Sequence, residues 1–314
     1  MNAYLQHSDR LQNWASRLDT IFARCKGAYS DLTLSGYRKD LDIFANWCAQ
    51  NDREFLPTQS DSVARFFDDQ LETCSYATIR RRASAIRFAH VLSDLPCPMN
   101  HSDVLLSIRR AARMKGRRPK QSLGLTKDLL GKMLTACPDT LPGHRDAALL
   151  CVGYDTLCRS SELTWMCIED VQHDLSRICI PRAKSDPFGD GRICFIQETT
   201  RVRLSRWIHR SQITTGPLFR GLHTGSVSNT HLDTSSIRRI IKTAARRAGL
   251  HREAIGLSGH SLRVGAAQDL MKEGFSTLAI MTAGGWSNPE VVSRYVAKAR
   301  NKFVPGNSVA QTSW

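Results

Sequence analysis

Apolar residues recur at helical spacing along most of this chain, and this pattern constrains the fold more than any other feature. Leu41, Phe44 and Cys48 show it well, because side chains three or four residues apart share one face of a helix. Ser60 begins another such run, and Ser75 is suited to cap the helix after it. The pattern predicts helices at residues 9–24, 34–51, 60–73, 76–93, 102–115, 126–136, 143–158 and 160–167, and again from residue 199 to the end.

One region departs from the helical pattern. The segments RICIPRAK and RICFIQ alternate or run apolar, and SDPFGDG between them contains proline, glycine and an Asp-Gly turn signal. They predict a β-hairpin with strands at about residues 177–183 and 192–197. The expected fold is therefore mainly α, with an all-helical N-terminal domain and a second helical domain that carries a small antiparallel sheet at one edge.

A basic segment marks the boundary between the two domains. Seven of the twelve residues from 109 to 120 are basic and none is acidic, and a glycine and a proline interrupt the helix. We expect one domain at 1–115, a basic linker at 116–125 and a second domain at 126–314. Arg117, Arg118 and Lys120 of the linker are suited to follow a phosphate backbone, and a solvated tether is the alternative.

The chain as a whole is also basic. Its 44 Lys and Arg residues against 29 Asp and Glu residues give a formal charge of +15. Such an excess indicates a polyanionic partner, most often nucleic acid, although a basic surface without a partner is the alternative. Predicted helix 76–93 concentrates charge at Arg80, Arg81, Arg82 and Arg87. It suits a DNA major groove, which admits a helix, or else it is a solvated basic face.

The sequence contains no pattern that predicts a metal, cofactor or disulfide site. Its ten cysteines are scattered without a CxxC pair, and there is no HExxH, acidic cluster or glycine-rich phosphate loop. No signal peptide is visible, and no stretch approaches the roughly 18 apolar residues of a membrane span. We therefore expect no cofactor, no membrane and reduced thiols in a cytoplasmic protein.

Seven chemically active side chains occur in a particular order. Each alone has an ordinary structural explanation, such as a helix end, a turn or a core position. One of them, Arg263, lies in GHSLRVGAAQDL among small and apolar residues, where a buried guanidinium needs an anion. The seven residues are Arg159, Glu162, Lys184, His260, Arg263, Trp286 and Tyr295.

This ordered set resembles the tyrosine recombinase (phage integrase) family. The stretches GYDTLCRSSEL, SGHSLRVGAAQDL and IMTAGGWSNPEVVSRYV carry the resemblance, and the N-terminal helices are also similar, so that it spans nearly the whole chain. It implies a core DNA-binding domain at 1–115 and a catalytic domain with a C-terminal tail at 126–314, closing as a clamp around a duplex.

The resemblance also implies a role for each residue. Tyr295 would attack phosphorus, and His260 would help the phenol, whose ordinary pKa is near 10, to lose its proton. Arg159 and Arg263 would grip the non-bridging oxygens through paired hydrogen bonds. Glu162 would orient the basic cluster.

Two further roles complete the set. Trp286 would donate its indole N–H to the phosphate, and Lys184 would protonate the 5′-oxygen leaving group. Only the resemblance selects Lys184, because the residues alone do not distinguish it from Arg182 or Arg192. Ser287-Asn288-Pro289-Glu290 reads as a capping box for the helix that presents the tyrosine.

The family's reaction implies an assembly as well. Two protomers would bind an inverted-repeat site in double-stranded DNA, and four would exchange strands through a Holliday junction in a bacterial, nucleoid-associated complex of phage or plasmid origin. Arg238 and Arg239 are candidate base readers, with phosphate contact as the alternative. The competing functions are a non-catalytic DNA-binding or architectural protein, a telomere resolvase and a type IB topoisomerase.

Overall fold

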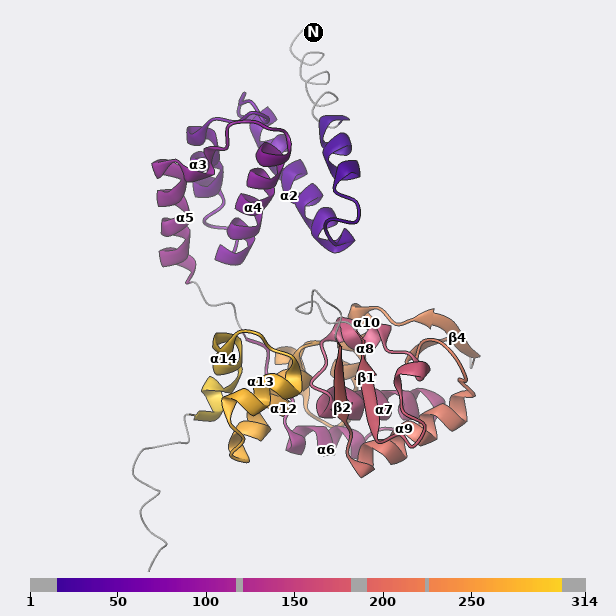
Figure 1. Cartoon of the computed structure of the whole chain (residues 1–314). Coiled ribbons are helices and arrows are strands. Elements are labelled where there is room, and N and C mark those ends of the chain that lie inside the picture. The colour runs from indigo at the N-terminus through magenta and orange to yellow at the C-terminus, as the bar shows by residue number, and fades with distance from the viewer. Residues whose placement is uncertain (1–15, 117–120, 182–190, 224–225, 301–314) are drawn as a thin grey trace, which may run out of the picture. The chain divides into compact units, whose positions relative to one another are not determined.

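The computed structural model describes residues 16–116, 121–181, 191–223 and 226–300, with side chains as far as Val296. The chain forms two compact units, Met1–Lys120 and Gln121–Trp314 (Figure 1). The described thiols include all ten cysteines, and each of them is free. No described helix combines the length and the apolar character that crossing a membrane requires.

The first unit is built from helices. A helical segment ends at residue 24, and α2 (Asp31–Gln50), α3 (Ser60–Asp69), α4 (Tyr76–Leu92), a short 3₁₀ turn (Pro98–Asn100) and α5 (Ser102–Lys115) follow. Ser75 caps α4 as predicted, because its hydroxyl accepts from the Thr78 N–H at 3.2 Å. Phe44 and Phe66 are fully buried and their ring centroids lie 4.8 Å apart, so aromatic packing forms the core of this unit.

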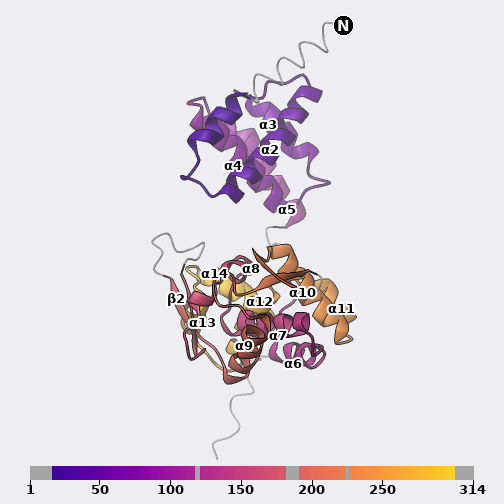
Figure 2. The ribbon, with the colours of Figure 1, turned by 90° about the vertical axis from the view of Figure 1, so that its right-hand side faces the viewer.

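The second unit surrounds one buried helix. Its helices are α6 (Lys127–Thr135), α7 (Leu141–Asp155), α8 (Ser160–Trp165), α9 (Glu198–Ser211), α10 (Thr234–Arg247), α11 (His251–Gly256), α12 (Ser261–Lys272), α13 (Thr277–Gly284) and α14 (Pro289–Arg300). From Ala147 to Tyr154, α7 is apolar on every side and buried, as expected of a helix that neighbours cover all round. α12, α13 and α14 contact one another at one side of the unit (Figure 1), and α10 lies beside α11 (Figure 2).

The predicted hairpin is present. β1 (Arg177–Ile180) and β2 (Arg192–Phe195) pair antiparallel, with Ile178 opposite Cys194. The alternation of buried and exposed residues puts Ile178, Ile180 and Cys194 against the core.

The expectation that only helices follow residue 199 is wrong. A second antiparallel hairpin, β3 (Arg220–His223) with β4 (Ser226–His231), lies between α9 and α10. Its strands are mostly polar and half-exposed, and only Leu222 and Val227 form an apolar cross-strand pair. The hydrophobic alternation that reveals a strand is therefore almost absent here.

Candidate active site

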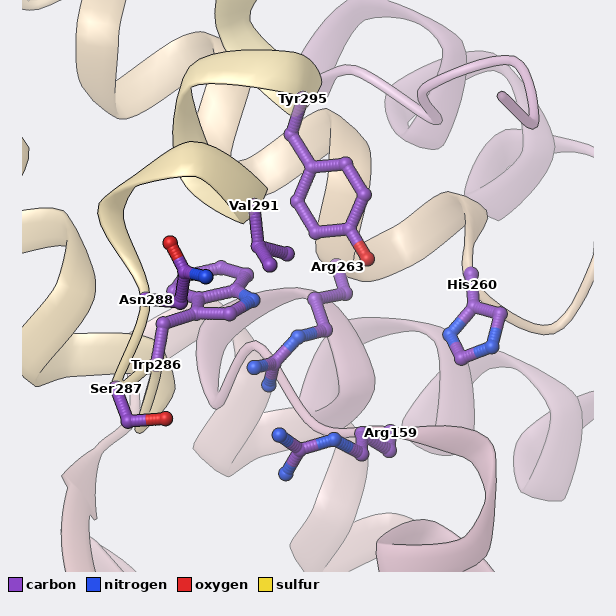
Figure 3. Close-up of a pocket in the computed structure, with 8 residues that line it drawn as sticks. All are labelled: Arg159, His260, Arg263, Trp286, Ser287, Asn288, Val291 and Tyr295. Carbon is purple, nitrogen blue, oxygen red and sulfur yellow. The ribbon is translucent and has the colours of Figure 1, made fainter. Parts of the chain in front are cut away.

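A pocket in the second unit collects five of the seven predicted catalytic residues (Figure 3). They come from the start of α8, the start of α12, the turn after α13 and the middle of α14. Lys184 lies outside the described residues, and Glu162 lies behind Arg159. The pocket is lined by Arg159, His260, Arg263, Trp286, Ser287, Asn288, Val291 and Tyr295.

Arg263 is the most deeply buried charge of the site, with only 1% of its surface exposed. Its guanidinium stacks on Trp286, 3.8 Å from the ring centroid, and donates to the Leu157 carbonyl. Its Nη2 has no hydrogen-bond partner within the described part of the chain. Burial, and then the charge of Arg159, lowers the pKa of Arg263 to about 10, so the group stays charged at neutral pH. A buried cation with an unused donor favours an anion in this pocket.

Arg159 is held in place by Glu162. It is the N-cap residue of α8; its backbone N–H donates to Glu162 Oε2 at 3.0 Å and its guanidinium donates to Oε1 at 2.5 Å. Burial would raise the pKa of Glu162, but the hydrogen bonds from Arg159 and the charge of Arg192 outweigh it and lower the pKa. Glu162 is therefore ionised and orients Arg159 toward the pocket.

His260 stands at the other rim, as the N-cap residue of α12. Partial burial, and then the charges of Arg263 and Arg159, lowers its pKa, so that its imidazole is neutral at pH 7 and able to accept a proton. The preceding Gly259 lets α12 start close to α8, because a Cβ there would lie 2.2 Å from Ser160 Oγ.

The turn after α13 places Trp286. Gly285 ends α13 with a φ of +64°, and the indole packs against Gly284, where a Cβ would come within 2.1 Å of the ring. Trp286 is 8% exposed, and its ring meets that of Tyr295 edge-on at a centroid distance of 5.8 Å. Its indole nitrogen faces the pocket (Figure 3).

α14 presents Tyr295 about two turns after its start. The Glu290 N–H donates to Asn288 Oδ1 at 2.8 Å, so the side chain that holds the start of α14 is Asn288 and not Ser287 as the capping box predicted. The Tyr295 hydroxyl points into the space bordered by Arg263, His260 and Arg159 (Figure 3). A phenol, a neutral imidazole and two guanidiniums thus surround one gap.

Arg192 has a structural role that the sequence did not reveal. Its Nη1 donates to the carbonyls of Thr156 at 2.7 Å and Ala283 at 2.8 Å, and its Nη2 donates to Glu162 at 3.1 Å. The guanidinium therefore links β2 to the ends of α7 and α13, which disfavours Arg192 as the general acid. The alternation of the strand could have indicated this role. Ile193 and Phe195 are exposed, so Arg192 lies on the inward face of β2 with Cys194.

The predicted DNA-binding residues separate into exposed and buried ones. Arg80, Arg81 and Arg87 are exposed on α4, as are Arg238 and Arg239 on α10, whereas Arg117, Arg118 and Lys120 lie outside the described residues.

The prediction that Arg82 binds DNA is wrong. The residue is only 9% exposed, and its guanidinium lies 3.6 Å from Asp40 and 6.0 Å from the Phe66 ring centroid. Its position on α4, one turn after the buried Ile79, turns it toward the core and not toward DNA.

Comparison with known proteins settles the family. The phage integrase family profile matches residues 124–302, and the profile of the phage integrase N-terminal SAM-like domain matches residues 22–91. The chain belongs to the phage integrase family. It is an enzyme of the tyrosine recombinase class, as the ordered set of polar residues predicted.

Relatives with similar length support this assignment. The chain is 28% identical over 310 residues to an integrase/recombinase XerD homologue of Selenomonas ruminantium, covering 94% of this chain and 88% of the relative. It is 27% identical over 294 residues to the Cre recombinase of Escherichia phage P1, covering 87% and 86%. The three active-site stretches predicted a likeness to Cre, and Cre is among the relatives that match this chain.

Solved structures show the same fold at low identity. XerH bound to a palindromic difH substrate matches with a TM-score of 0.67 at 17% identity, covering 96% of this chain and 86% of that chain. The Tn1549 transposon integrase, solved with transposon right-end DNA, matches with a TM-score of 0.66 at 14% identity, covering 91% and 98%. Both structures have the helical architecture described above.

Proposed function

We propose that this protein is a site-specific recombinase that cleaves and rejoins double-stranded DNA through a 3′-phosphotyrosyl intermediate at Tyr295. One observation carries the proposal: buried Arg263, whose Nη2 has no hydrogen-bond partner among the described residues, lines the same pocket as Tyr295. A phosphodiester supplies the anion that this arginine lacks, and it offers the phosphorus that the phenol would attack.

The chemistry divides among the pocket residues. The Tyr295 oxygen bonds to phosphorus while the bond from phosphorus to the 5′-oxygen breaks, and His260 takes the phenolic proton. Lys184 donates a proton to the departing 5′-oxygen. Arg159 and Arg263 stabilise the charge that builds on the non-bridging oxygens, and the indole of Trp286 adds a donor.

The rejoining step is the reverse reaction. A 5′-hydroxyl from a second strand attacks the phosphotyrosyl bond and releases the phenol, so that the number of phosphodiester bonds is unchanged. We further propose that residues 1–115 and 126–314 hold the duplex together with linker 116–125, that two protomers occupy an inverted repeat, and that four exchange strands through a Holliday junction. The recombinase names of the relatives and the palindromic substrate of XerH support this assembly.

The DNA contacts are proposed from exposure and charge. Arg80, Arg81 and Arg87 on α4 would face one stretch of the site. Arg238 and Arg239 on α10 would face another, either at base edges or at phosphates.

A nicked suicide substrate tests the proposal. The duplex carries the inverted repeat that the protein selects from a random pool, with a nick near the cleavage position so that the freed fragment diffuses away. We expect a covalent protein–DNA adduct in the presence of EDTA, no adduct from Tyr295→Phe, and normal adduct from the control Tyr37→Phe in the first unit. An adduct that survives Tyr295→Phe, or that depends on Mg²⁺, contradicts the mechanism.

A second assay separates the competing activities. A topoisomerase relaxes supercoiled plasmids that lack the repeat, whereas the recombinase joins two plasmid-borne repeats and leaves repeat-free plasmids supercoiled. An architectural protein binds the repeat and does neither.

A further inference from the structure

The main-chain carbonyl of Tyr295 is held by two glutamine side chains. Gln268 Nε2 donates to this oxygen at 3.0 Å, and Gln121 Nε2 donates to the same oxygen at 3.2 Å. Both donors are distant in sequence from the tyrosine, and both bind the peptide group of the nucleophile itself. The mechanism proposed above assigns no role to either glutamine.

Gln268 belongs to the helix that also supplies Arg263. It lies on α12, five residues after Arg263, and is only 7% exposed. A buried amide in this position is specified by its surroundings, because Gly124 leaves the space that it occupies: a Cβ on Gly124 would lie 2.2 Å from Gln268 Oε1. The absence of a side chain at Gly124 therefore allows Gln268 to reach the Tyr295 carbonyl.

Gln121 reaches the same oxygen from a segment that is fixed on α12. The Leu125 N–H donates to the Ser261 carbonyl at 2.8 Å, and Gly265 lies so close to Leu125 that a Cβ would come within 1.9 Å of its carbonyl oxygen. Segment 121–125 thus cannot shift independently of α12. Both donors place α14 relative to the helix that begins at His260.

We propose that Gln268 and Gln121 are positioning residues that set the register of α14, and thereby the approach of the Tyr295 hydroxyl to phosphorus. This inference rests on the proposed function. An in-line attack tolerates little displacement of the nucleophile, and a shift of about 1 Å costs on the order of 10²-fold in rate. We call the two hydrogen bonds from Gln268 and Gln121 to the Tyr295 carbonyl the carbonyl clamp. This clamp positions the attacking oxygen without contacting DNA.

The central variant is Gln268→Met, which keeps the length and volume of the side chain but removes its donor. We expect single-turnover cleavage of the suicide substrate, at saturating DNA, to fall about fivefold, as expected for one lost neutral hydrogen bond. DNA affinity should stay within about twofold, because the clamp does not bind DNA. Gln268→Glu should cleave more slowly than Gln268→Met, because a carboxylate oxygen then opposes the Tyr295 carbonyl.

The chain offers a matched control and an independent route. Gln212 Nε2 donates to the His209 carbonyl at 2.6 Å after α9, so Gln212→Met removes the same kind of bond outside the pocket and should cleave normally. Gly124→Ala should displace the Gln268 amide and reproduce the cleavage defect of Gln268→Met. Gln121→Met combined with Gln268→Met should lose more than either single variant, because each remaining donor partly replaces the other.

Two readouts separate positioning from a general loss of structure and from the proposed function. With a 5′-bridging sulfur leaving group, which departs without a proton, the defect of Gln268→Met should persist, because the attacking group is the one misplaced. If the unaltered protein forms no adduct, the proposed function is wrong. Suppose that the unaltered protein forms the adduct. The positioning role is then refuted if Gln268→Met and the double variant both cleave at the rate of the unaltered protein, or if Gln268→Glu and Gln268→Met cleave at equal rates.

Discussion

Replacing Arg263 by Met should separate stability from activity. The pKa of Arg263, lowered from its ordinary value to about 10, means that the fold disfavours its charge by about 3 kcal/mol. This penalty is present throughout the neutral range and is relieved only as pH rises above the folded-state pKa. Methionine is similar in length and carries no charge, so it removes the penalty.

Two interactions are lost at the same time. The bond to the Leu157 carbonyl is worth about 1 kcal/mol, and the stacking on Trp286 about 1–2 kcal/mol. These losses nearly cancel the relief. We expect the free energy of unfolding of Arg263→Met to change by less than about 1 kcal/mol, whereas an ordinary core truncation costs about 2–5 kcal/mol.

Activity should respond very differently. Loss of one preorganised donor to a developing oxyanion costs about 3–4 kcal/mol, which corresponds to a fall in cleavage rate of about 10²–10³-fold. Urea denaturation of the free protein and single-turnover cleavage of the suicide substrate measure the two quantities. The reasoning is refuted if Arg263→Met loses more than about 2 kcal/mol of stability, or if it cleaves within about tenfold of the unaltered rate.

Three further predictions follow from the same contacts. The cleavage rate should fall on acidification with a midpoint below the ordinary histidine pKa of 6.5, because His260 must be neutral to accept a proton, and His260→Gln should abolish this acidic limb in a pH–rate profile. Arg82→Met should lower the free energy of unfolding by about 1–2 kcal/mol and leave DNA affinity unchanged, whereas the exposed Arg80→Met should leave stability unchanged and reduce the salt dependence of binding by about one phosphate contact. Gly284→Ala should destabilise by about 1–3 kcal/mol because its Cβ meets the indole ring, while Gly131→Ala, with no atom within 4 Å, should gain up to about 1 kcal/mol in thermal or urea unfolding.

The sequence predicted those features that depend on strong local patterns. Helices with apolar stripes, such as α2 and α3, and the hairpin of β1 and β2 were predicted because burial of one face imposes a period on the sequence. The polar hairpin of β3 and β4 escaped prediction because it buries little and so imposes no period. Arg82 was misassigned because three consecutive arginines conceal which one faces the core. Asp40 does not distinguish them, since Arg81 donates to it at 2.6 and 2.9 Å, and only the burial of Arg82 does.

The pocket residues were recognisable as an ordered set, but their interactions were not. Gln121 and Gln268 meet on one carbonyl through contacts between distant segments, and no local pattern in the sequence marks such a meeting. Gly124 and Gly284 likewise appear unremarkable in the sequence, although each leaves space for one particular side chain. Tertiary contacts of this kind become visible only when the distances are known.

The distribution of charge beneath the pocket supports the proposal that a phosphate binds there. Arg159, Arg192 and Arg263 surround a single carboxylate, that of Glu162, whose described hydrogen bonds go to Arg159 and Arg192. The positive charges of its neighbours therefore repel Arg263, and no carboxylate among the described residues hydrogen-bonds to it. The sequence placed Arg159 and Arg263 together, but the excess of positive charge follows only once Arg192 is found to share the same acid. An anion that enters the gap would relieve this excess. Under the proposed function, the cost of burying Arg263 in the free protein would therefore be recovered when it binds the reacting phosphate.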